Sequence, residues 1–227
     1  MRRLNAILPL IITAAVLMLV PLMATSPLSV DNSSASYNLL VASGYLCDAT
    51  NSGSCPAVAQ AANGDSIELS GVGTLNLSSK TVNAMGAFTY KSSNGEIVET
   101  GIWKATELMK FDSYGVAPGA LMRDKRLSKS LGLFPMGFFN GPLPTGGLAL
   151  LRIQLLPDAG KPKDAILQVN CAIGKVPENQ KRDGIKLAVI SDELKFDQKV
   201  SGRTMFMLTK PWVSVTSKSS MPAGSPE

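Results

Sequence analysis

Histidine is absent from the 227 residues of the chain, and this absence limits the chemistry that the protein can do. Without an imidazole there can be no Ser-His-Asp triad, no Cys-His pair and no histidine-ligated metal ion. The phosphate-binding patterns G-x-x-x-x-G-K-[ST] and G-x-G-x-x-G do not occur either. The sequence therefore excludes imidazole catalysis, gives no support to nucleotide binding and predicts no cofactor.

Paired carboxylates are the remaining enzymatic option. Glu96 and Glu99 follow an expected turn at Asn94-Gly95, and a glycosidase needs two carboxyl groups that face one another across a cleft. Acidic side chains beside a tight turn are more often solvated, so a secreted hydrolase that works without histidine is the alternative interpretation and not the first one.

The stretch SDELKFD brings together Asp192, Glu193 and Asp197. Their oxygens would suit Ca²⁺, but the stretch lacks the glycine and the spacing of a calcium loop. A solvated charged connection is the favoured interpretation, and the sequence predicts no metal site.

Two aromatic side chains are candidates for binding a glycan, together with the long connection 116–147. Tyr114 precedes a glycine, and Trp212 follows a proline after the last expected strand. The alternatives are that Tyr114 caps the edge of the core with its hydroxyl in water and that Trp212 plugs the end of the domain.

The first half of the connection 116–147 is basic. Four positive side chains within seven residues favour contact with an anionic wall polymer, lipid head groups or an acidic envelope protein. The alternative is that they only keep the loop soluble. These residues are Arg123, Lys125, Arg126 and Lys129.

The second half, LGLFPMGFFNGPLP, is apolar and holds three phenylalanines, Phe134, Phe138 and Phe139. So many apolar side chains do not stay in water as one patch. They either fold back over the domain, which we favour because sheet edges must be covered, or form an interface with a subunit, a partner or a membrane.

The N-terminus predicts export. Arg2 and Arg3 precede an apolar run from Ala6 to Ala24, which is typical of a signal peptide and also long enough for a membrane anchor helix. Either way the remainder lies outside the cytoplasm: extracellular, periplasmic or anchored and facing outward. Membrane contact is expected only through this segment if it is not cleaved.

The remainder divides into a polar linker (25–36), one domain (37–213) and a polar tail (214–227) that is too poor in apolar residues to fold. The formal net charge of the whole chain is +5, and two of the positive charges belong to the N-terminal arginines. This surplus is too small to indicate binding to nucleic acid.

Three cysteines remain to be paired in an oxidising compartment. Cys47 and Cys55 bracket a short polar loop, whereas Cys171 lies in an apolar, strand-like run. A Cys47–Cys55 disulfide with a buried free Cys171 is favoured over a bridge that uses Cys171. Their spacing does not suit zinc.

Short strand-like segments separated by glycine, asparagine and proline fill the domain. DSIELSG and VGTLNLS are read as two strands divided by Gly71, and GAFTYKSSNGEIVETGIW as a hairpin that turns at Asn94-Gly95. Further strands are expected in LALLRIQLLP, AILQVNCAIG, IKLAVI and RTMFMLT. The fold class is all-β: an antiparallel β-sandwich or a flattened barrel after the N-terminal signal or anchor helix.

The stretch GIWKATELMKFDSYG shows a broken helical stripe, and the strand interpretation is narrowly better. On a strand, Trp103, Ala105, Met109 and Phe111 share one face, while Leu108 falls on the wrong one. Trp103 and Phe111 are therefore predicted to be core residues.

Several short patterns resemble a group of uncharacterised, secreted, β-rich microbial proteins. The resemblance spans about residues 43–208, and it implies one secreted domain without a known activity. The patterns are S-G-x-G-T at 70–74, G-A-F-T at 86–89, G-x-W-x-A-T-x-L at 101–108, F-x-S-Y-G at 111–115 and C-x-I-G at 171–174.

Overall fold

The computed structural model describes residues 35–47, 53–117 and 142–209. Within these ranges the protein is almost entirely β-structure. The strands are β1 (Ser36–Val41), β2 (Ala57–Ala61), β3 (Ser66–Asn76), β4 (Thr81–Lys91), β5 (Ile97–Val116), β6 (Leu143–Pro157), β7 (Lys163–Cys171), β8 (Gly184–Val189), β9 (Lys195–Ser201) and β10 (Thr204–Leu208). Two short 3-10 helices are η2 (Gly44–Leu46) and η3 (Glu178–Gln180). No helix in the described ranges has the length and apolar composition needed to cross a membrane.

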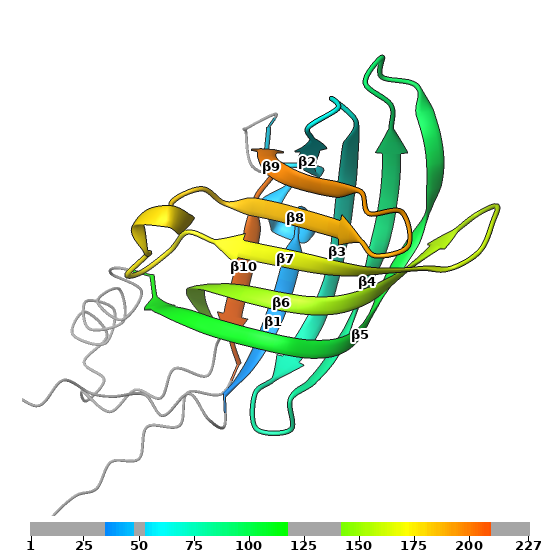
Figure 1. Ribbon diagram of the computed structural model, residues 1–227. Helices are drawn as coiled ribbons and strands as arrows, with labels where there is room; N and C mark the ends of the chain where they lie inside the picture. Colours follow the sequence, from blue (N-terminus) through cyan, green and yellow to red (C-terminus); the bar gives the residue numbers. More distant parts are fainter. Residues whose placement is uncertain (1–34, 48–52, 118–141, 210–227) are drawn as a thin grey trace, which may run out of the picture.

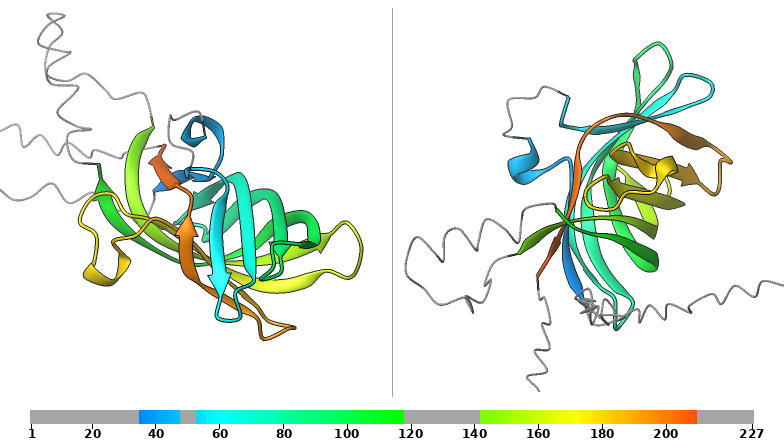
Figure 2. Two further views of the ribbon diagram at one scale, coloured as in Figure 1. Left: turned by 90° about the horizontal axis from the view of Figure 1, so that it is seen from above. Right: turned by 90° about the vertical axis from the view of Figure 1, so that its left-hand side faces the viewer.

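Hydrogen bonds join all ten strands into one antiparallel sheet, in the order β1-β10-β6-β5-β4-β3-β2-β9-β8-β7. A further pairing of β6 with β7 closes the part of the sheet that runs from β6 through β5, β3 and β9 to β7, and β1 also pairs with β3. The sheet curls so that β5, β6, β7 and β8 cross over β1, β3, β4 and β10 (Figures 1 and 2). The apolar core lies between these two crossing layers.

The expectation of an all-β, antiparallel fold is confirmed. The described residues do not form the two separate sheets of a sandwich, because long strands such as β5 and β6 bend and continue from one part of the sheet into the next. The flattened-barrel alternative describes this arrangement better.

Alternation of apolar and polar residues explains why these segments form half-buried strands. On β7, Ala165, Leu167 and Val169 face inward and are fully buried, and the residues between them are more exposed. The same period of two runs along β6. Such alternation commits one face of each strand to the core.

The stretch GIWKATELMKFDSYG is a strand, as expected, and belongs to β5. Its inward face differs from the expected one: Leu108 is buried, whereas Met109 is 42% exposed. The register between β5 and β6 shifts at three places, one of them between Leu108 and Lys110. Each extra residue at a bulge reverses the face of those that follow, which resolves the broken pattern.

Trp103 is fully buried, so its predicted place in the core is confirmed. Its indole Nε1 donates a hydrogen bond to the carbonyl oxygen of Ser70, at 3.0 Å. The ring lies so close to Gly71 that a Cβ atom there would be 2.4 Å from a ring carbon. Phe111 is half-buried and packs between Tyr37 and Phe206, with ring centroids 4.7 and 4.9 Å away.

Gly71 is therefore not a boundary between two strands, and that prediction is wrong. Strand β3 continues through it, because the glycine makes room for the indole of Trp103 and does not turn the chain. The hairpin at Asn94-Gly95 is confirmed: β4 and β5 flank it, and Gly95 has a φ of 87°. The four further expected strands correspond to β6, β7, β8 and β10, whereas β1, β2 and β9 were not predicted.

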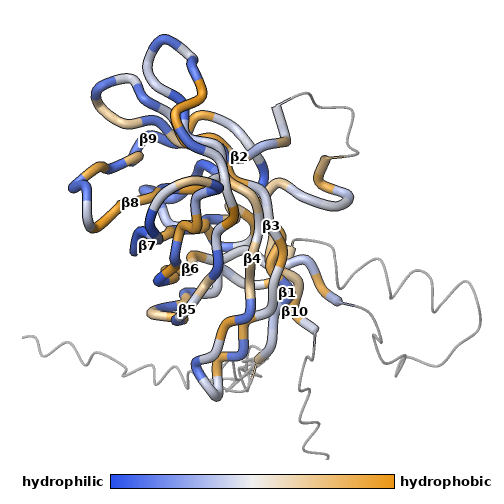
Figure 3. The backbone as a smooth tube through the Cα atoms, turned by 90° about the vertical axis from the view of Figure 1, so that its right-hand side faces the viewer, coloured by the Kyte–Doolittle hydropathy of each residue, from blue (hydrophilic) through white to orange (hydrophobic). Residues whose placement is uncertain are grey.

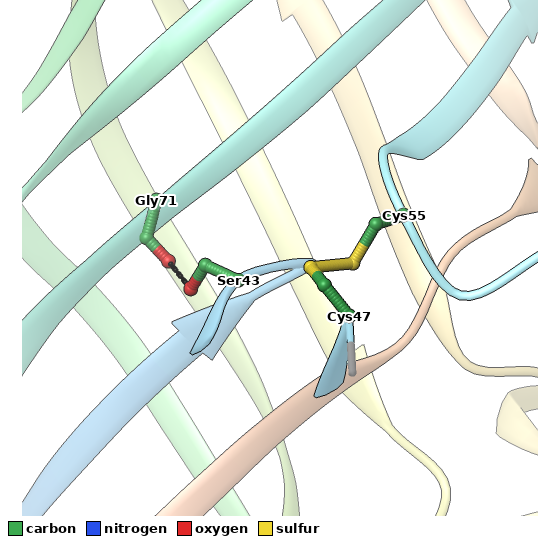
Figure 4. The surroundings of a disulfide bond; sticks show 4 residues. All are labelled: Ser43, Cys47, Cys55 and Gly71. Carbon is green, nitrogen blue, oxygen red and sulfur yellow. Dashed lines mark hydrogen bonds between the residues drawn. A yellow bond between two sulfur atoms is a disulfide. The ribbon is translucent and has the colours of Figure 1, made fainter. Parts of the chain in front are cut away.

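The Cys47–Cys55 disulfide is confirmed, and Cys171 is a buried free thiol. The disulfide ties η2 to the residues before β2, and the hydroxyl of Ser43 donates to the carbonyl oxygen of Gly71 at 2.7 Å (Figure 4). Burial raises the pKa of the Cys171 thiol to about 12, so this thiol is chemically inert in the folded protein.

The N-terminal segment 1–24, the linker up to residue 34, the loop 118–141 and the tail 214–227 lie outside the described residues. The expectations for these parts of the chain stay predictions.

Candidate functional site

A small pocket opens at the end of the closed sheet where the β4–β5, β6–β7 and β8–β9 hairpins lie. Its empty volume of about 270 Å³ includes open solvent, and the enclosed part has room for only about one water-sized group. Its floor is apolar and is formed by the ends of strands from both layers: Ile67, Phe88, Leu155, Val189 and Phe196. Side chains fill the interior of a closed sheet of this width, which leaves room for a ligand only at its ends.

Lys163 lies at the mouth of this pocket and joins two hairpins. Its Nζ is 3.2 Å from a carboxylate oxygen of Glu99 on β5 and 3.3 Å from one of Asp192 in the β8–β9 turn. Burial alone would lower the pKa of Lys163, but the hydrogen bonds to the two carboxylates outweigh it and raise the pKa. The lysine is therefore charged at neutral pH.

Tyr90 forms the other side of the mouth. Its hydroxyl donates to a carboxylate oxygen of Asp65 at 2.6 Å, and its ring meets that of Phe196 edge-on, with centroids 5.7 Å apart. This hydrogen bond raises the pKa of Tyr90 to about 12 and lowers that of Asp65. The backbone N–H of Ser93 also donates to Asp65, at 2.9 Å, so the carboxylate fixes the β4–β5 turn beside the pocket.

The mouth therefore carries the carboxylates of Glu99 and Asp192, the ammonium group of Lys163 and the hydroxyl of Tyr90 around an apolar floor. The four groups present both donors and acceptors, and the excess of one negative charge disfavours an anionic ligand. Among the described residues no group of three or more acidic or cysteine side chains is arranged to hold a metal ion. Such an arrangement can bind hydroxyl groups of a neutral ligand by hydrogen bonds.

Of the binding residues predicted from the sequence, the structure describes only Tyr114. This side chain is 6% exposed, and its hydroxyl donates to Oδ1 of Asn170 at 3.0 Å. The expectation of a hydroxyl in water is wrong, because the hydroxyl is buried against Asn170 of β7. The buried ring has no free face on which a sugar could stack.

The other five predicted binding residues lie outside the described residues. They are Arg123, Lys125, Arg126, Lys129 and Trp212.

The acidic residues considered from the sequence do not all lie at one site. Glu96 is exposed in the β4–β5 turn, as expected, while Glu99 reaches the pocket. Asp192 also reaches the pocket. Asp197 lies on β9, a strand that was not predicted because the sequence around it is charged.

Sequence reasoning missed Asp65, Tyr90 and Lys163. They stand on three different hairpins, and no local pattern links them, so only the long-range pairing of β3, β4 and β7 brings them together. Alternation on β4 and β7 was the one available signal, since Tyr90 and Lys163 each continue the inward face of a strand at its end.

A second polar group lies at the opposite end of β7. Asn170 is fully buried and donates to the carbonyl oxygens of Gln180 and Arg182, at 2.9 and 2.8 Å. Lys199 also donates to the carbonyl oxygen of Arg182, at 2.8 Å. Burial, followed by the nearby charge of Lys186, lowers the pKa of Lys199 to about 8. These bonds fasten the β7–β8 connection, which is a structural role.

Comparison with known proteins found no match for this chain among family models, curated proteins or solved structures.

Proposed function

We propose that the protein is an exported, non-catalytic binding module that holds the end of a glycan in the pocket beside Lys163. The observation that carries the proposal is the convergence of Tyr90, Glu99, Lys163 and Asp192 on the mouth of an apolar pocket. Apolar floors with a few polar groups that fix orientation are typical of small-molecule sites.

The size and charge of the pocket favour a neutral sugar over the other partners considered. The enclosed part of the pocket is small, so only an edge of one terminal sugar ring, or a single group that it carries, would enter it while the rest of the sugar stays at the mouth. An anionic wall polymer would meet two carboxylates and only one ammonium group. An envelope protein would need a larger surface than this mouth offers.

The hydrolase alternative has less support at this site. Glu99 and Asp192 both line the pocket, but the ammonium group of Lys163 binds both. A glycosidase needs the glycosidic bond in that position, with water or a covalent intermediate. The arrangement supports recognition more than hydrolysis.

Export is supported by the N-terminal Arg2-Arg3 and apolar run and by the disulfide, since disulfides persist mainly in oxidising compartments. Fractionation of the protein in its host, with N-terminal sequencing of the product, tests this part. A product beginning near Thr25 outside the cytoplasm, or an intact chain in the membrane fraction, fits the proposal. A soluble cytoplasmic product would contradict it.

Isothermal titration with neutral monosaccharides and their short oligomers tests the binding function. We expect a Kd on the order of 1 mM for the best sugar, because only part of one sugar would be enclosed. Glu99→Ala should weaken binding about tenfold or more, because hydrogen bonds to a charged acceptor contribute about 1.5–3 kcal/mol. Glu96→Ala is the matched control, since Glu96 lies on the same hairpin but outside the pocket.

Two results would overturn the binding proposal. Affinity that is equal in Glu99→Ala and the unchanged protein would place the site elsewhere. Release of reducing sugar that Glu99→Ala abolishes would make the protein a hydrolase.

A further inference from the structure

The floor of the pocket beside Lys163 is formed by apolar side chains from both crossing layers of the sheet. Each of them is at most 5% exposed, and they stand on β3, β4, β6, β8 and β9: Ile67, Phe88, Leu155, Val189 and Phe196. A hydroxyl group that entered here would find no hydrogen-bond partner on the floor, and burial of an unpaired hydroxyl costs free energy. The group that enters the pocket must therefore be apolar.

The enclosed part of the pocket also limits the size of that group. It has room for only about one water-sized group. A methyl group is apolar and close to this size, whereas an ethyl group or the face of a sugar ring is larger. The pocket therefore fits a ligand that presents a single methyl group to the floor.

Polar groups with unused hydrogen-bonding capacity surround the entrance to this floor. An ammonium group has three N–H donors, and Lys163 directs two of them to Glu99 and Asp192, at 3.2 and 3.3 Å. The hydroxyl of Tyr90 donates to Asp65, so its oxygen can still accept a hydrogen bond. The carboxylates of Glu99 and Asp192 also keep lone pairs. One donor and several acceptors thus remain for a ligand.

An amide group matches these remaining partners. Its carbonyl oxygen can accept from the third N–H of Lys163, and its N–H can donate to Tyr90 or Glu99. In an acetamido group the amide carbon is bonded directly to a methyl group. The methyl group can therefore lie on the apolar floor while the amide stays among the polar groups of the mouth. The methyl group of a 6-deoxy sugar has no N–H or C=O beside it.

We propose that the pocket is specific for an N-acetylated hexosamine, whose acetyl methyl group occupies the enclosed part. The inference rests on the proposed function, because it names the kind of sugar that the same site holds. The sugar ring stays at the mouth, where its hydroxyl groups meet Glu99 and Asp192. An acetamido group is neutral, which suits a mouth with an excess of one negative charge.

NMR titrations with matched sugars test this specificity without changing the protein. N-acetylglucosamine should bind at least tenfold more tightly than glucose, which has a hydroxyl in place of the acetamido group, because it gains a buried methyl group and two hydrogen bonds. N-propanoylglucosamine should bind at least tenfold more weakly than N-acetylglucosamine, because the enclosed part does not admit its extra carbon atom. Nuclear Overhauser contacts should join the acetyl methyl protons to Val189 and Leu155.

A substitution at Lys163 tests the role of the amide. Lys163→Met removes the donor to the amide carbonyl oxygen and should weaken the binding of N-acetylglucosamine at least tenfold. Lys161→Met is the matched control: the same change in the same β6–β7 connection, at an exposed residue outside the pocket, should leave the affinity unchanged. Thermal unfolding confirms that both variants fold.

The outcomes separate this inference from the proposed function. Equal affinities for N-acetylglucosamine and glucose at the pocket would overturn the acetyl specificity and leave glycan binding standing. Tighter binding of L-fucose, which carries its methyl group on the ring, would overturn the specificity too. So would a preference for N-acetylglucosamine without methyl contacts to Val189 and Leu155. Failure of every sugar to bind would overturn the proposed function as well.

Discussion

Trp103 is the residue on which the interior packing depends most. It is fully buried, and the backbone of β3 at Gly71 approaches its ring closely. Trp103→Ala should lower the free energy of unfolding by about 3–5 kcal/mol, the usual result of removing a buried aromatic side chain. Chemical denaturation measures this. Ile102→Ala, at the exposed position next to it, should cost less than about 0.5 kcal/mol. Equal stability of the Trp103→Ala protein and the unchanged one would contradict the core assignment.

Lys199 gives the stability a specific pH dependence. Its folded-state pKa of about 8 lies below its ordinary value of 10.5, so between these values the unfolded chain binds more protons than the folded one. The free energy of unfolding therefore rises as pH increases through 8, and it falls as pH decreases. From pH 7.5 to 9.5 the gain from this group is about 2 kcal/mol.

Denaturation of the protein and of Lys199→Met across this pH range measures the effect as a difference between the two. The pKa values of Cys171 and Tyr90 are raised to about 12, so these two groups lower the free energy of unfolding as pH rises. They do so equally in both proteins, and their effect cancels in the difference. A constant difference in stability between pH 7.5 and 9.5 would show that Lys199 titrates normally in the folded protein.

At the scale of single elements, β7 holds the free thiol on the inward side of a central strand. Cys171 is fully buried, and its raised pKa leaves almost no thiolate at neutral pH. An alkylating reagent should therefore modify no thiol in the native protein and one thiol after unfolding without reductant. Mass spectrometry gives the count. Rapid native labelling would mean that the end of β7 opens.

The elements that could be predicted from the sequence are those with strong local patterns. Alternating β6 and β7 and the Asn94-Gly95 turn were recognised from residues close together in the chain. Strand β9 was missed, since KFDQKVS carries three charges and has only Phe196 and Val200 as large apolar residues; its partner β2 fixes it. Bulges in β5 likewise respond to β6 and leave no signal in β5 alone.

The candidate site was less predictable than the fold for the same reason. Glu99 and Asp192 were each considered from their own neighbourhoods, in two unrelated schemes. Their shared contact with Lys163 arises because the β4–β5, β6–β7 and β8–β9 hairpins meet at one end of the closed sheet. The composition of one segment does not indicate which hairpins lie beside it in the folded chain.

At the scale of the whole molecule, the curled sheet separates the pocket from the outer side of β10, β1, β3 and β4, which are neighbouring strands (Figure 3). The pocket opens among hairpins at one end. Met85 lies on the outer side of β4 and is 50% exposed, so the Met85→Lys protein should bind sugar with unchanged affinity.

The measurement that tests the central claim most directly is a two-dimensional ¹H–¹⁵N NMR titration of the protein with neutral monosaccharides. It reports where a ligand binds as well as whether it does. Binding at the pocket predicts saturable shifts of the backbone amides of Tyr90, Glu99, Lys163 and Asp192. Shifts confined to other parts of the molecule, or none at millimolar sugar, would contradict the claim that this pocket holds a glycan.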